Sequence, residues 1–359
     1  MGGLFRGGRG IRVPGSLREV LSAVAVVDHH AHGILREPPA TLDTFRGLFS
    51  ESEDPRQWPH VATAVTYRRA IRALAAQLGC EPSEDAVYAH RLATDPAAYA
   101  SALLRATNTE VLLVDDGFPP AAESVNWREL GLLADCVSRP VLRIERVAAE
   151  AGIEGVREAV AGARAKGFAA LKTIAAYRGG LDLDRLGAGV RDALIAALEV
   201  NAASDLPLPV QVHTGFGDAD LSLPLARPGL LKPLIERFAT TPFVLLHCYP
   251  YVREAGWLAH VYPNVFFDLS LTIPHVSRPA VALAEALELA PVSKLLYASD
   301  AARTPELYFL AATWWRDALA TVLPELLDDA GEAEEAARAI LRENALALYG
   351  LESSGASPD

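Results

Sequence analysis

The sequence of 359 residues contains few cysteines, methionines and lysines: three, one and four, respectively. Cys80, Cys136 and Cys248 are too few and too scattered for a disulfide framework or a cysteine-rich zinc site. We therefore expect a reducing, cytoplasmic environment. Because lysine is scarce, a lysine inside an apolar run stands out, and Lys172 is such a residue.

The sequence also lacks an apolar run long enough to span a membrane, which needs about 18 residues, and its first residues lack the apolar core of a signal peptide. Acidic side chains outnumber basic ones by 45 to 33, and the formal net charge is −12. This charge repels nucleic-acid phosphates and anionic membrane surfaces. We expect neither as a partner and expect a small-molecule substrate instead. The oligomeric state stays open, and a homo-oligomer is compatible with the sequence.

Eight short apolar runs alternate with segments of helical periodicity. Their length and nearly continuous hydrophobicity are typical of strands buried on both faces of a parallel sheet. The runs are 23–27, 110–114, 140–144, 168–174, 208–212, 243–246, 265–271 and 294–299. Eight such units predict an α/β fold of the (β/α)8 TIM-barrel type rather than a doubly wound sheet, which usually has fewer strands and a glycine-rich first turn.

Two regions depart from this alternation. Residues 33–108, between the first two runs, contain three periodic segments, which we interpret as a helical insertion at the barrel rim. After the eighth run, two C-terminal helices are predicted, the last ending at Gly350. We predict one barrel domain over residues 1–350 and a disordered tail over 351–359.

Every apolar run contains or ends in an ionisable side chain, and in such barrels the carboxyl ends of the strands form the functional face. His30 and His32 are two residues apart, so both imidazoles lie on one face of a strand and can bind one cation. His213, His247 and Asp300 end later strands. Each of these alone is more typical of a core or capping residue, but together with the histidine pair they form the ligand set of a borderline divalent metal.

The motif Asp28-His29-His30-Ala31-His32, taken with the later strand ends, resembles the amidohydrolase superfamily. More narrowly, the chain resembles the amidohydrolase-2 type domain that precedes a glutamine synthetase-like domain in FluG and nodulin-like fusion proteins. The segments that carry this resemblance are 171–181, 211–221, 245–271 and 295–311. The chain stops near residue 359, so we expect the hydrolase domain without the synthetase domain.

The resemblance implies metal-dependent hydrolysis of a C–N amide bond, with His30, His32, His213, His247 and Asp300 in the metal and catalytic positions. The cation would be Zn²⁺ or else Mn, Fe or Ni, and one or two ions are expected. It would lower the pKa of a bound water from 15.7 towards about 7. Asp300 would carry a proton to the leaving nitrogen, while His247 or His213 would be a ligand or polarise the scissile carbonyl.

Lys172 has three interpretations. In binuclear members of the superfamily, a lysine on the fourth strand forms a carbamate that bridges two metals, which requires a buried, neutral amine. An unmodified ammonium group would instead bind a carboxylate of the substrate. The third interpretation is a structural ion pair with Glu145 or another acid of the barrel.

Side chains just beyond the strand ends are candidates for binding the substrate. The aromatic and basic candidates are Tyr177, Arg178, Tyr249 and Arg253. Arginine suits a carboxylate, although both arginines could equally be solvated loop residues. The acids Asp115, Asp116 and Glu145 could hold an ammonium group or cap a helix. Residues 215–222 are glycine-rich and could form either a mobile lid or a static loop.

These residues suggest a zwitterionic or carboxylated amide, and the synthetase domain of the similar fusion proteins suggests a γ-glutamyl amide. A metal-dependent decarboxylase or isomerase of the same superfamily is the first alternative. A non-catalytic barrel scaffold is the second alternative. Buried histidines argue against it, because their desolvation destabilises the fold and a scaffold has no catalytic need for them.

Overall fold

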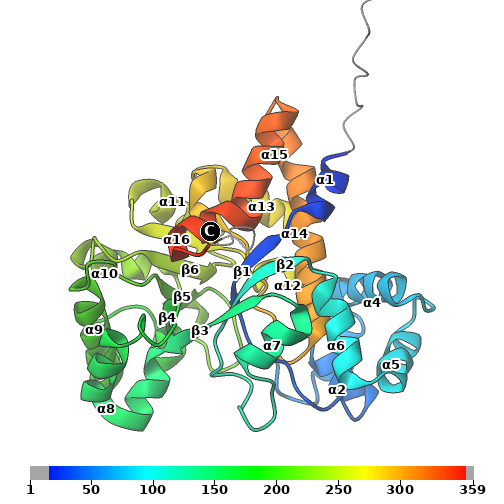
Figure 1. Cartoon of the computed structure of the whole chain (residues 1–359), viewed down its shortest axis with the longest axis horizontal. Helices are drawn as coiled ribbons and strands as arrows, with labels where there is room; N and C mark the ends of the chain where they lie inside the picture. The colour runs from blue at the N-terminus through cyan, green and yellow to red at the C-terminus, as the bar shows by residue number, and fades with distance from the viewer. Residues whose placement is uncertain (1–15, 353–359) are drawn as a thin grey trace, which may run out of the picture.

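The computed structural model describes residues 16–352, and within them eight strands form one parallel sheet in chain order. The strands are β1 (Val26–Ala31), β2 (Thr109–Val114), β3 (Val137–Arg143), β4 (Ala170–Thr173), β5 (Val210–Thr214), β6 (Phe243–His247), β7 (Val265–Asp268) and β8 (Leu295–Leu296). The sheet curls into a nearly closed barrel with helices outside it (Figure 1). The predicted (β/α)8 barrel is confirmed.

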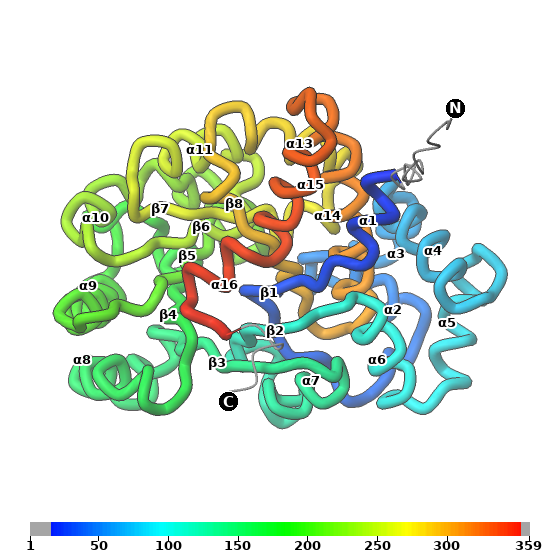
Figure 2. Tube along the Cα trace, turned by 45° about the horizontal axis from the view of Figure 1, so that its top comes forward, coloured from blue at the N-terminus to red at the C-terminus, as the bar shows by residue number. Residues whose placement is uncertain are grey.

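Helices surround the barrel, because each parallel connection must return the chain to the start of the next strand. They are α7 (Trp127–Ala134), α8 (Ile144–Ala161), α9 (Ala188–Ala202), α10 (Lys232–Arg237), α11 (Val252–Val261), α13 (Pro279–Leu287) and α14 (Pro305–Leu326). Figure 2 shows α8 to α13 following one another around the strands. Shorter turns lie in the loops: η1 (Ala175–Arg178), η2 (Leu223–Leu225), η3 (Pro228–Leu231), α12 (Thr272–His275) and η4 (Val292–Lys294).

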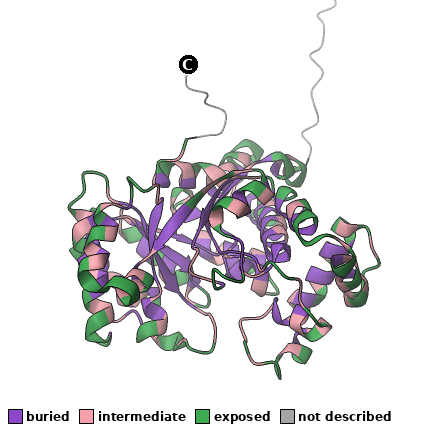
Figure 3. Cartoon of the chain, turned by 60° about the horizontal axis from the view of Figure 1, so that its bottom comes forward, coloured by how far each residue is buried: buried purple, intermediate pink, exposed green. Residues whose placement is uncertain are grey.

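The strands are buried on both faces, as their continuous hydrophobicity predicts (Figure 3). Alternate residues such as Leu112 belong to a large core shared with the helices. The others, such as Val27 and Leu113, form a smaller cluster that Tyr349 joins. This apolar cluster fills the interior of the barrel, so the polar strand-end residues gather at the carboxyl ends of the strands.

The seam between β8 and β1 is closed by loop hydrogen bonds, since β8 spans only two residues. The backbone N–H of Asp300 donates to the carbonyl of His30 at 2.9 Å, and the N–H of His32 donates to the carbonyl of Ala301 at 2.9 Å. The closure therefore holds the loop after β8 directly beside the histidine pair of β1.

Residues 33–108 contain α2 (Leu42–Gly47), α3 (Trp58–Val61), α4 (Val65–Leu78), α5 (Glu84–Ala93) and α6 (Pro96–Arg105), which lie to one side of the barrel in Figure 1. A buried ion pair joins this insertion to the barrel: Arg91 of α5 contacts Glu306 of α14. The hydroxyl of Tyr99 on α6 donates to the same carboxylate at 3.0 Å. The insertion is thereby fixed against the first turn of α14, close to the carboxyl ends of the strands.

The chain ends of the described region differ in part from expectation. Residues Leu17–Ala23 form helix α1, so the first strand begins at Val26 and ends at Ala31; it includes His30, and His32 follows directly after it. After α14 come α15 (Ala330–Arg338), a π-helical turn (Ala339–Glu343) and α16 (Asn344–Tyr349). Gly350 has φ +60°, the left-handed conformation expected of a residue that terminates a helix. Most of the tail predicted to be disordered, residues 353–359, lies outside the described residues.

Between residues 16 and 352, no helix combines the length and the hydrophobicity needed to cross a lipid bilayer.

Candidate metal centre

His30, His32 and Asp300 meet at the carboxyl end of β1. The two imidazole rings have centroids 4.9 Å apart. Asp300, in the loop after β8, has φ +49° and directs its carboxylate towards both rings. Its Oδ1 lies 3.0 Å from Nε2 of His30 and 3.2 Å from Nε2 of His32. Predicted ligands at the carboxyl ends of the first and the eighth strand are thus in contact.

Hydrogen bonds to the other ring nitrogens determine which nitrogen carries the proton. Nδ1 of His32 lies 3.0 Å from the backbone oxygen of Asp115, which can only accept. Nδ1 of His30 lies 2.9 Å from Oε1 of Gln211, whose Nε2 donates to the carbonyl of His29 at 2.6 Å. Both histidines therefore carry the proton on Nδ1 and present the lone pair of Nε2 to Asp300.

This arrangement fits a divalent cation. Two unprotonated nitrogens face a carboxylate oxygen, and Oδ1 of Asp300 is buried without a hydrogen-bond donor in residues 16–352. Three acceptors at these distances repel one another unless a positive charge lies between them. Their separations are close to the roughly 3.3 Å between neighbouring ligands of a tetrahedral zinc with bonds of about 2.0–2.1 Å. All three ligand atoms lie within 4.8 Å of one another.

The protonation states agree with this interpretation. Burial, reinforced by the charge of Lys172, lowers the pKa of His30 to about 3. Burial alone would raise the pKa of Asp300, but the nearby His247 holds it well below its ordinary value. A neutral imidazole and an ionised carboxylate are the forms that bind a cation.

His247 and His213 lie beside this triad. Nδ1 of His247 is 2.7 Å from Oγ of Ser270, whose proton goes to Oδ1 of Asp268 at 2.7 Å, so His247 also carries its proton on Nδ1. The same Nδ1 lies 3.6 Å from Oδ2 of Asp300. The ring of His213 packs edge-on against that of His247, with centroids 4.5 Å apart, and its buried Nε2 has no partner in the described structure. Both remain able to act as further ligands or to contact the substrate.

Lys172 on β4 is 2% exposed, and its Nζ lies 3.1 Å from Nε2 of His30. Burial lowers the pKa of Lys172 to about 8. Glu145 does not pair with it, because Oε1 of Glu145 accepts from Thr173 at 2.5 Å and from the N–H of Ile174 at 3.0 Å. The ion pair with Glu145 is thus absent, and no other carboxylate of residues 16–352 lies within ion-pair distance of Lys172, although the charges of Asp300 and Asp115 act on it. The carbamate and the substrate-binding ammonium are the interpretations that we carry forward.

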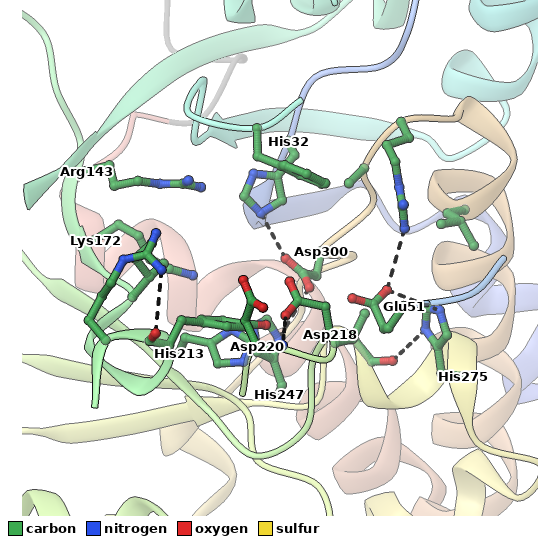
Figure 4. Close-up of a pocket in the computed structure, with 18 residues that line it drawn as sticks. His32, Glu51, Arg143, Lys172, His213, Asp218, Asp220, His247, His275 and Asp300 are labelled. Carbon is green, nitrogen blue, oxygen red and sulfur yellow. Dashed lines mark hydrogen bonds and ion pairs between the residues drawn. The ribbon is translucent and has the colours of Figure 1, made fainter. Parts of the chain in front are cut away.

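A cavity of about 220 Å³ opens over these residues (Figure 4). His32, Lys172, His213, His247 and Asp300 all line it. So do further charged side chains of both signs, namely Glu51, Arg143, Arg178, Asp218, Asp220 and Arg303. The cavity therefore combines the triad with cations and carboxylates that can bind a charged substrate.

Tyr177 and Arg178, two of the predicted substrate-binding residues, are brought to this cavity by the turn η1. The ring of Tyr177 lies 4.5 Å from that of His213. Its hydroxyl is so close to Gly217 that a Cβ there would lie 1.9 Å away. Residue 217 must therefore be glycine for the loop after β5 to pack on this phenol.

The other predicted substrate-binding residues do not line the cavity: Asp116, Glu145, Tyr249 and Arg253. Asp116 is half-buried beside the start of α7, where the N–H of Trp127 contacts it. Tyr249 is 43% exposed and packs on Phe216. Arg253 lies on the surface of α11 and pairs with glutamates of the α13 region at 3.4 and 3.6 Å. Glu145 is one residue beyond the start of α8, so its side chain turns away from the barrel mouth towards the β4 loop.

Several cavity residues were not predicted. Arg143, the last residue of β3, is held by Asp115 through Nη2 at 2.6 Å. Its place at a strand end could have indicated it. Asp218 and Asp220 lie in the glycine-rich loop considered as a lid. Glu51 comes from the insertion, and nothing in its local sequence indicates that it reaches the cavity.

Comparison with known proteins identifies the family. A family model described as amidohydrolase, Amidohydro_2, matches residues 27–351, a range that includes every residue of the triad. The chain belongs to the Amidohydro_2 family of amidohydrolases. The resemblance seen in the sequence is confirmed, and the family supports a metal-dependent hydrolase with a divalent cation.

Individual relatives of this amidohydrolase agree with that assignment. Protein fluG of Emericella nidulans is 29% identical over 410 residues, which cover 94% of this chain and 47% of fluG, so the chain spans about half the length of that curated relative. A solved structure described as a metal-dependent hydrolase from Lactobacillus casei is 29% identical, with a TM-score of 0.83 over 93% of this chain and 97% of that one. Uronate isomerase from Thermotoga maritima, 14% identical with a TM-score of 0.62 over 93% and 96% of the two chains, shares the fold.

Proposed function

We propose that this amidohydrolase hydrolyses the C–N bond of a small carboxylated amide, with γ-glutamyl amides as the leading candidates. The observation that carries the proposal is the convergence of two unprotonated histidine nitrogens and an ionised carboxylate at the floor of a charged cavity. We also propose that the protein acts in the cytoplasm on a small molecule, without nucleic acid or membrane.

His30, His32 and Asp300 would hold the cation, for which zinc is our first choice and Mn, Fe or Ni are alternatives. When bound, the cation supplies Lewis acidity, which lowers the pKa of water and polarises a carbonyl group. The remaining catalytic tasks belong to the side chains of the protein.

The two oxygens of Asp300 face different partners. Oδ1 faces the nitrogens of His30 and His32, and Oδ2 faces His247 at 3.6 Å. Oδ2 is therefore placed to take a proton from the attacking water and to return it to the leaving nitrogen. In the overall reaction a C–O bond forms, the C–N bond breaks, and water supplies the oxygen and the proton.

Tyr177 is placed to stabilise negative charge on the substrate oxygen. Burial, together with the carboxylates of Asp218 and Glu51, raises the pKa of Tyr177, so the phenol stays protonated. The backbone N–H of Asp218 contacts the phenol oxygen, which leaves the phenol proton for a substrate oxygen. His213, with its unpartnered Nε2, lies on the same side of the cavity.

The basic side chains would hold the carboxylate of the substrate. Arg178 makes a 3.5 Å contact with the carbonyl of Tyr177 and no ion pair with any described residue. Its guanidinium is thus available for a bidentate pair with a carboxylate. Lys172, as an ammonium group, would add a second positive charge.

The direct test is to incubate the metal-loaded protein with a panel of γ-glutamyl amides and to measure free glutamate. Release of glutamate that a chelator abolishes supports the proposal. Release of CO₂ from the same compounds would instead indicate a decarboxylase, and conversion of uronates would indicate an isomerase. Bound metal with no turnover of any of these compounds would favour the scaffold.

The metal count separates the two remaining interpretations of Lys172. The triad accommodates one cation, so we expect about one equivalent of metal per chain and the same count in Lys172→Ala. Two equivalents in the wild type, with one lost in the variant, would show instead that Lys172 is carbamylated and bridges two ions.

A further inference from the structure

A second cavity adjoins the catalytic one. It is an open groove of about 640 Å³ between two segments, residues 50–60 of the insertion and residues 217–219 of the loop after β5. Glu51 and Asp218 line both the groove and the catalytic cavity. A ligand that leaves the catalytic cavity on this side therefore passes between these two carboxylates.

The catalytic cavity is smaller than most pockets that bind small molecules. Its volume of about 220 Å³ lies below the range of about 300–1,000 Å³ that is usual for small-molecule pockets. His213, which lines this cavity, is only 5% exposed. Its buried Nε2 has no hydrogen-bond partner in the described structure. A ligand larger than this cavity can extend into the groove, because the two share Glu51 and Asp218.

The passage between the two cavities carries negative charge. Glu51 lies within ion-pair distance of Arg303, 3.9 Å from its Nη2, and 3.8 Å from Nε2 of His275, so its charge is partly balanced and the unpaired negative charge of the passage comes mainly from Asp218 and Asp220. Within the groove, Asp54 is already matched by Arg56 through contacts of 3.0, 3.0 and 2.5 Å. The Asp54–Arg56 pair is neutral as a unit and does not offset the carboxylates of the passage.

The other carboxylate of the passage is Asp218. Its Oδ1 accepts the backbone N–H of Asp220 at 2.9 Å, and no basic side chain among residues 16–352 lies within ion-pair distance of it. Asp220 lines the catalytic cavity beside it. Figure 4 shows Asp218 and Asp220 together in front of His247, with Glu51 beyond Asp218.

Two of the basic residues that line the catalytic cavity, Arg143 and Lys172, lie opposite Glu51, whereas Arg303 pairs with Glu51 itself. In Figure 4, Arg143 and Lys172 lie on one side of Asp300, and Glu51 lies on the other. The cavity is therefore polarised, with positive charge where the acyl part of an amide would bind and negative charge where the amine part would leave.

We infer that the amine part of the substrate carries a second, positively charged nitrogen and extends between Glu51 and Asp218 into the groove. The substrate class is thus an acylated diamine, with a carboxylate on the acyl side and an ammonium group at the far end of the amine. This inference rests on the proposed amide hydrolysis. Most side chains that line the groove are polar or charged, and none is a large aliphatic or aromatic hydrophobe, which suits a hydrated ammonium chain better than an aliphatic or aromatic amine.

The test compares two γ-glutamyl amides of equal size, one of 1,4-diaminobutane and one of n-pentylamine, which differ by a terminal ammonium in place of a methyl group. We expect kcat/KM to be about tenfold higher for the diaminobutane amide at low ionic strength, because charge-assisted contacts form only with it. Equal values, or a preference for the pentylamide, would overturn the inference.

Variants locate the preference in the passage. Glu51→Gln and Asp218→Asn should each lower the ratio of kcat/KM for the two amides by about threefold. The matched control is Glu53→Gln, which removes the same charge from the same loop at an exposed residue that lines neither cavity. A ratio that falls equally in Glu53→Gln would show a general effect of net charge and would contradict a specific passage.

Calorimetric titration of the two amides into metal-loaded protein separates this inference from the proposed function. Tighter binding of the diaminobutane amide, by about tenfold, supports the inference even if neither amide is hydrolysed. Absence of hydrolysis with this preference would overturn only the proposed function. Hydrolysis of both amides with equal affinity would overturn only the inference.

Discussion

Asp300 is the single residue whose conformation matters most to the candidate metal centre. Its left-handed backbone conformation, φ +49°, is uncommon for a residue with a side chain and is held by the hydrogen bond from its N–H to His30. This conformation directs one carboxylate oxygen to the histidine pair and the other towards His247. In the proposed mechanism, ligand binding and proton transfer would therefore fall to different atoms of one side chain.

Asp300→Asn should retain most of the metal and lose most of the turnover. The amide oxygen can still face the two histidines, but the side chain can no longer take and return a proton. We expect kcat to fall by about 10²–10⁴-fold, measured with metal content by elemental analysis on the same sample. If the metal is lost in parallel with activity, Asp300 acts chiefly as a ligand.

Asp116 provides a test of pH-dependent stability away from the triad. Burial, with the nearby charge of Asp115, raises the pKa of Asp116 to about 6. Since the folded-state pKa lies above that of the unfolded chain, protonation of Asp116 stabilises the fold at low pH, and this contribution is lost as the pH rises through about 6.

Asp116→Asn keeps an acceptor for the N–H of Trp127 and removes the charge. The free energy of unfolding of the variant, relative to that of wild type, should be about 1 kcal/mol higher at pH 7.5 than at pH 4. This value allows for solvent screening at the half-buried site. Urea unfolding of both proteins at the two pH values measures the difference. A difference that does not change with pH would contradict the raised pKa.

The residues that form the triad were predictable because their spacing and their positions at strand ends are local features of the sequence. Arg143 and Glu145 show the limit of this reasoning. Both lie near the end of the third strand, but the chain turns into α8 at Ile144, so Arg143 faces the cavity and Glu145 does not. The exact residue at which the third strand ends therefore decides whether a basic or an acidic side chain lines the cavity.

Helix α14 organises the elements around the site. Its first turn carries Glu306, which anchors the insertion through Arg91. Further along, the buried Arg316 donates to the carbonyls of Leu21, Val24 and Thr107 at 2.8–2.9 Å. These bonds tie α1 and the segments that lead into β1 and β2 to the same helix, and β1 leads directly into the histidine pair at His30 and His32.

Arg316→Met should destabilise the fold by about 3 kcal/mol, because three buried carbonyls lose their donors. The control is Arg18→Met, which removes an exposed partner of Asp317, with a side chain 62% exposed, and should change the stability by less than about 1 kcal/mol. Urea unfolding measures both. Equal effects of the two substitutions would show that the buried donor is not required.

At the same scale, the sequence predicted all eight strands and the helical nature of the insertion, because buried strands and amphipathic helices have distinct periodicities. It did not predict α1, whose residues continue into the first apolar run. Nor could it place Glu51, since the approach of a loop in the insertion to the barrel mouth depends on tertiary contacts such as that between Arg91 and Glu306.

For the whole molecule, the barrel brings together residues that are far apart in sequence. His30 and Asp300 are joined because the curled sheet brings its first and eighth strands side by side, where loop hydrogen bonds connect them. The cation would therefore connect the beginning and the end of the barrel, so that its binding and the stability of the fold are linked.

Removal of metal should lower the stability of the whole molecule. If free metal is present at 100 times its Kd, chelation should reduce the free energy of unfolding by about 2.7 kcal/mol. Thermal unfolding with and without a chelator measures the change, and His32→Ala should show the lower stability in both conditions. An equal response of His32→Ala and wild type to the chelator would mean that the metal binds elsewhere.

Anomalous diffraction from crystals of the metal-loaded protein tests the central claim most directly. The arrangement of unprotonated nitrogens around the Asp300 carboxylate predicts one strong peak enclosed by Nε2 of His30, Nε2 of His32 and Oδ1 of Asp300. A peak outside this triad, or no peak in protein shown to retain metal in solution, would contradict it.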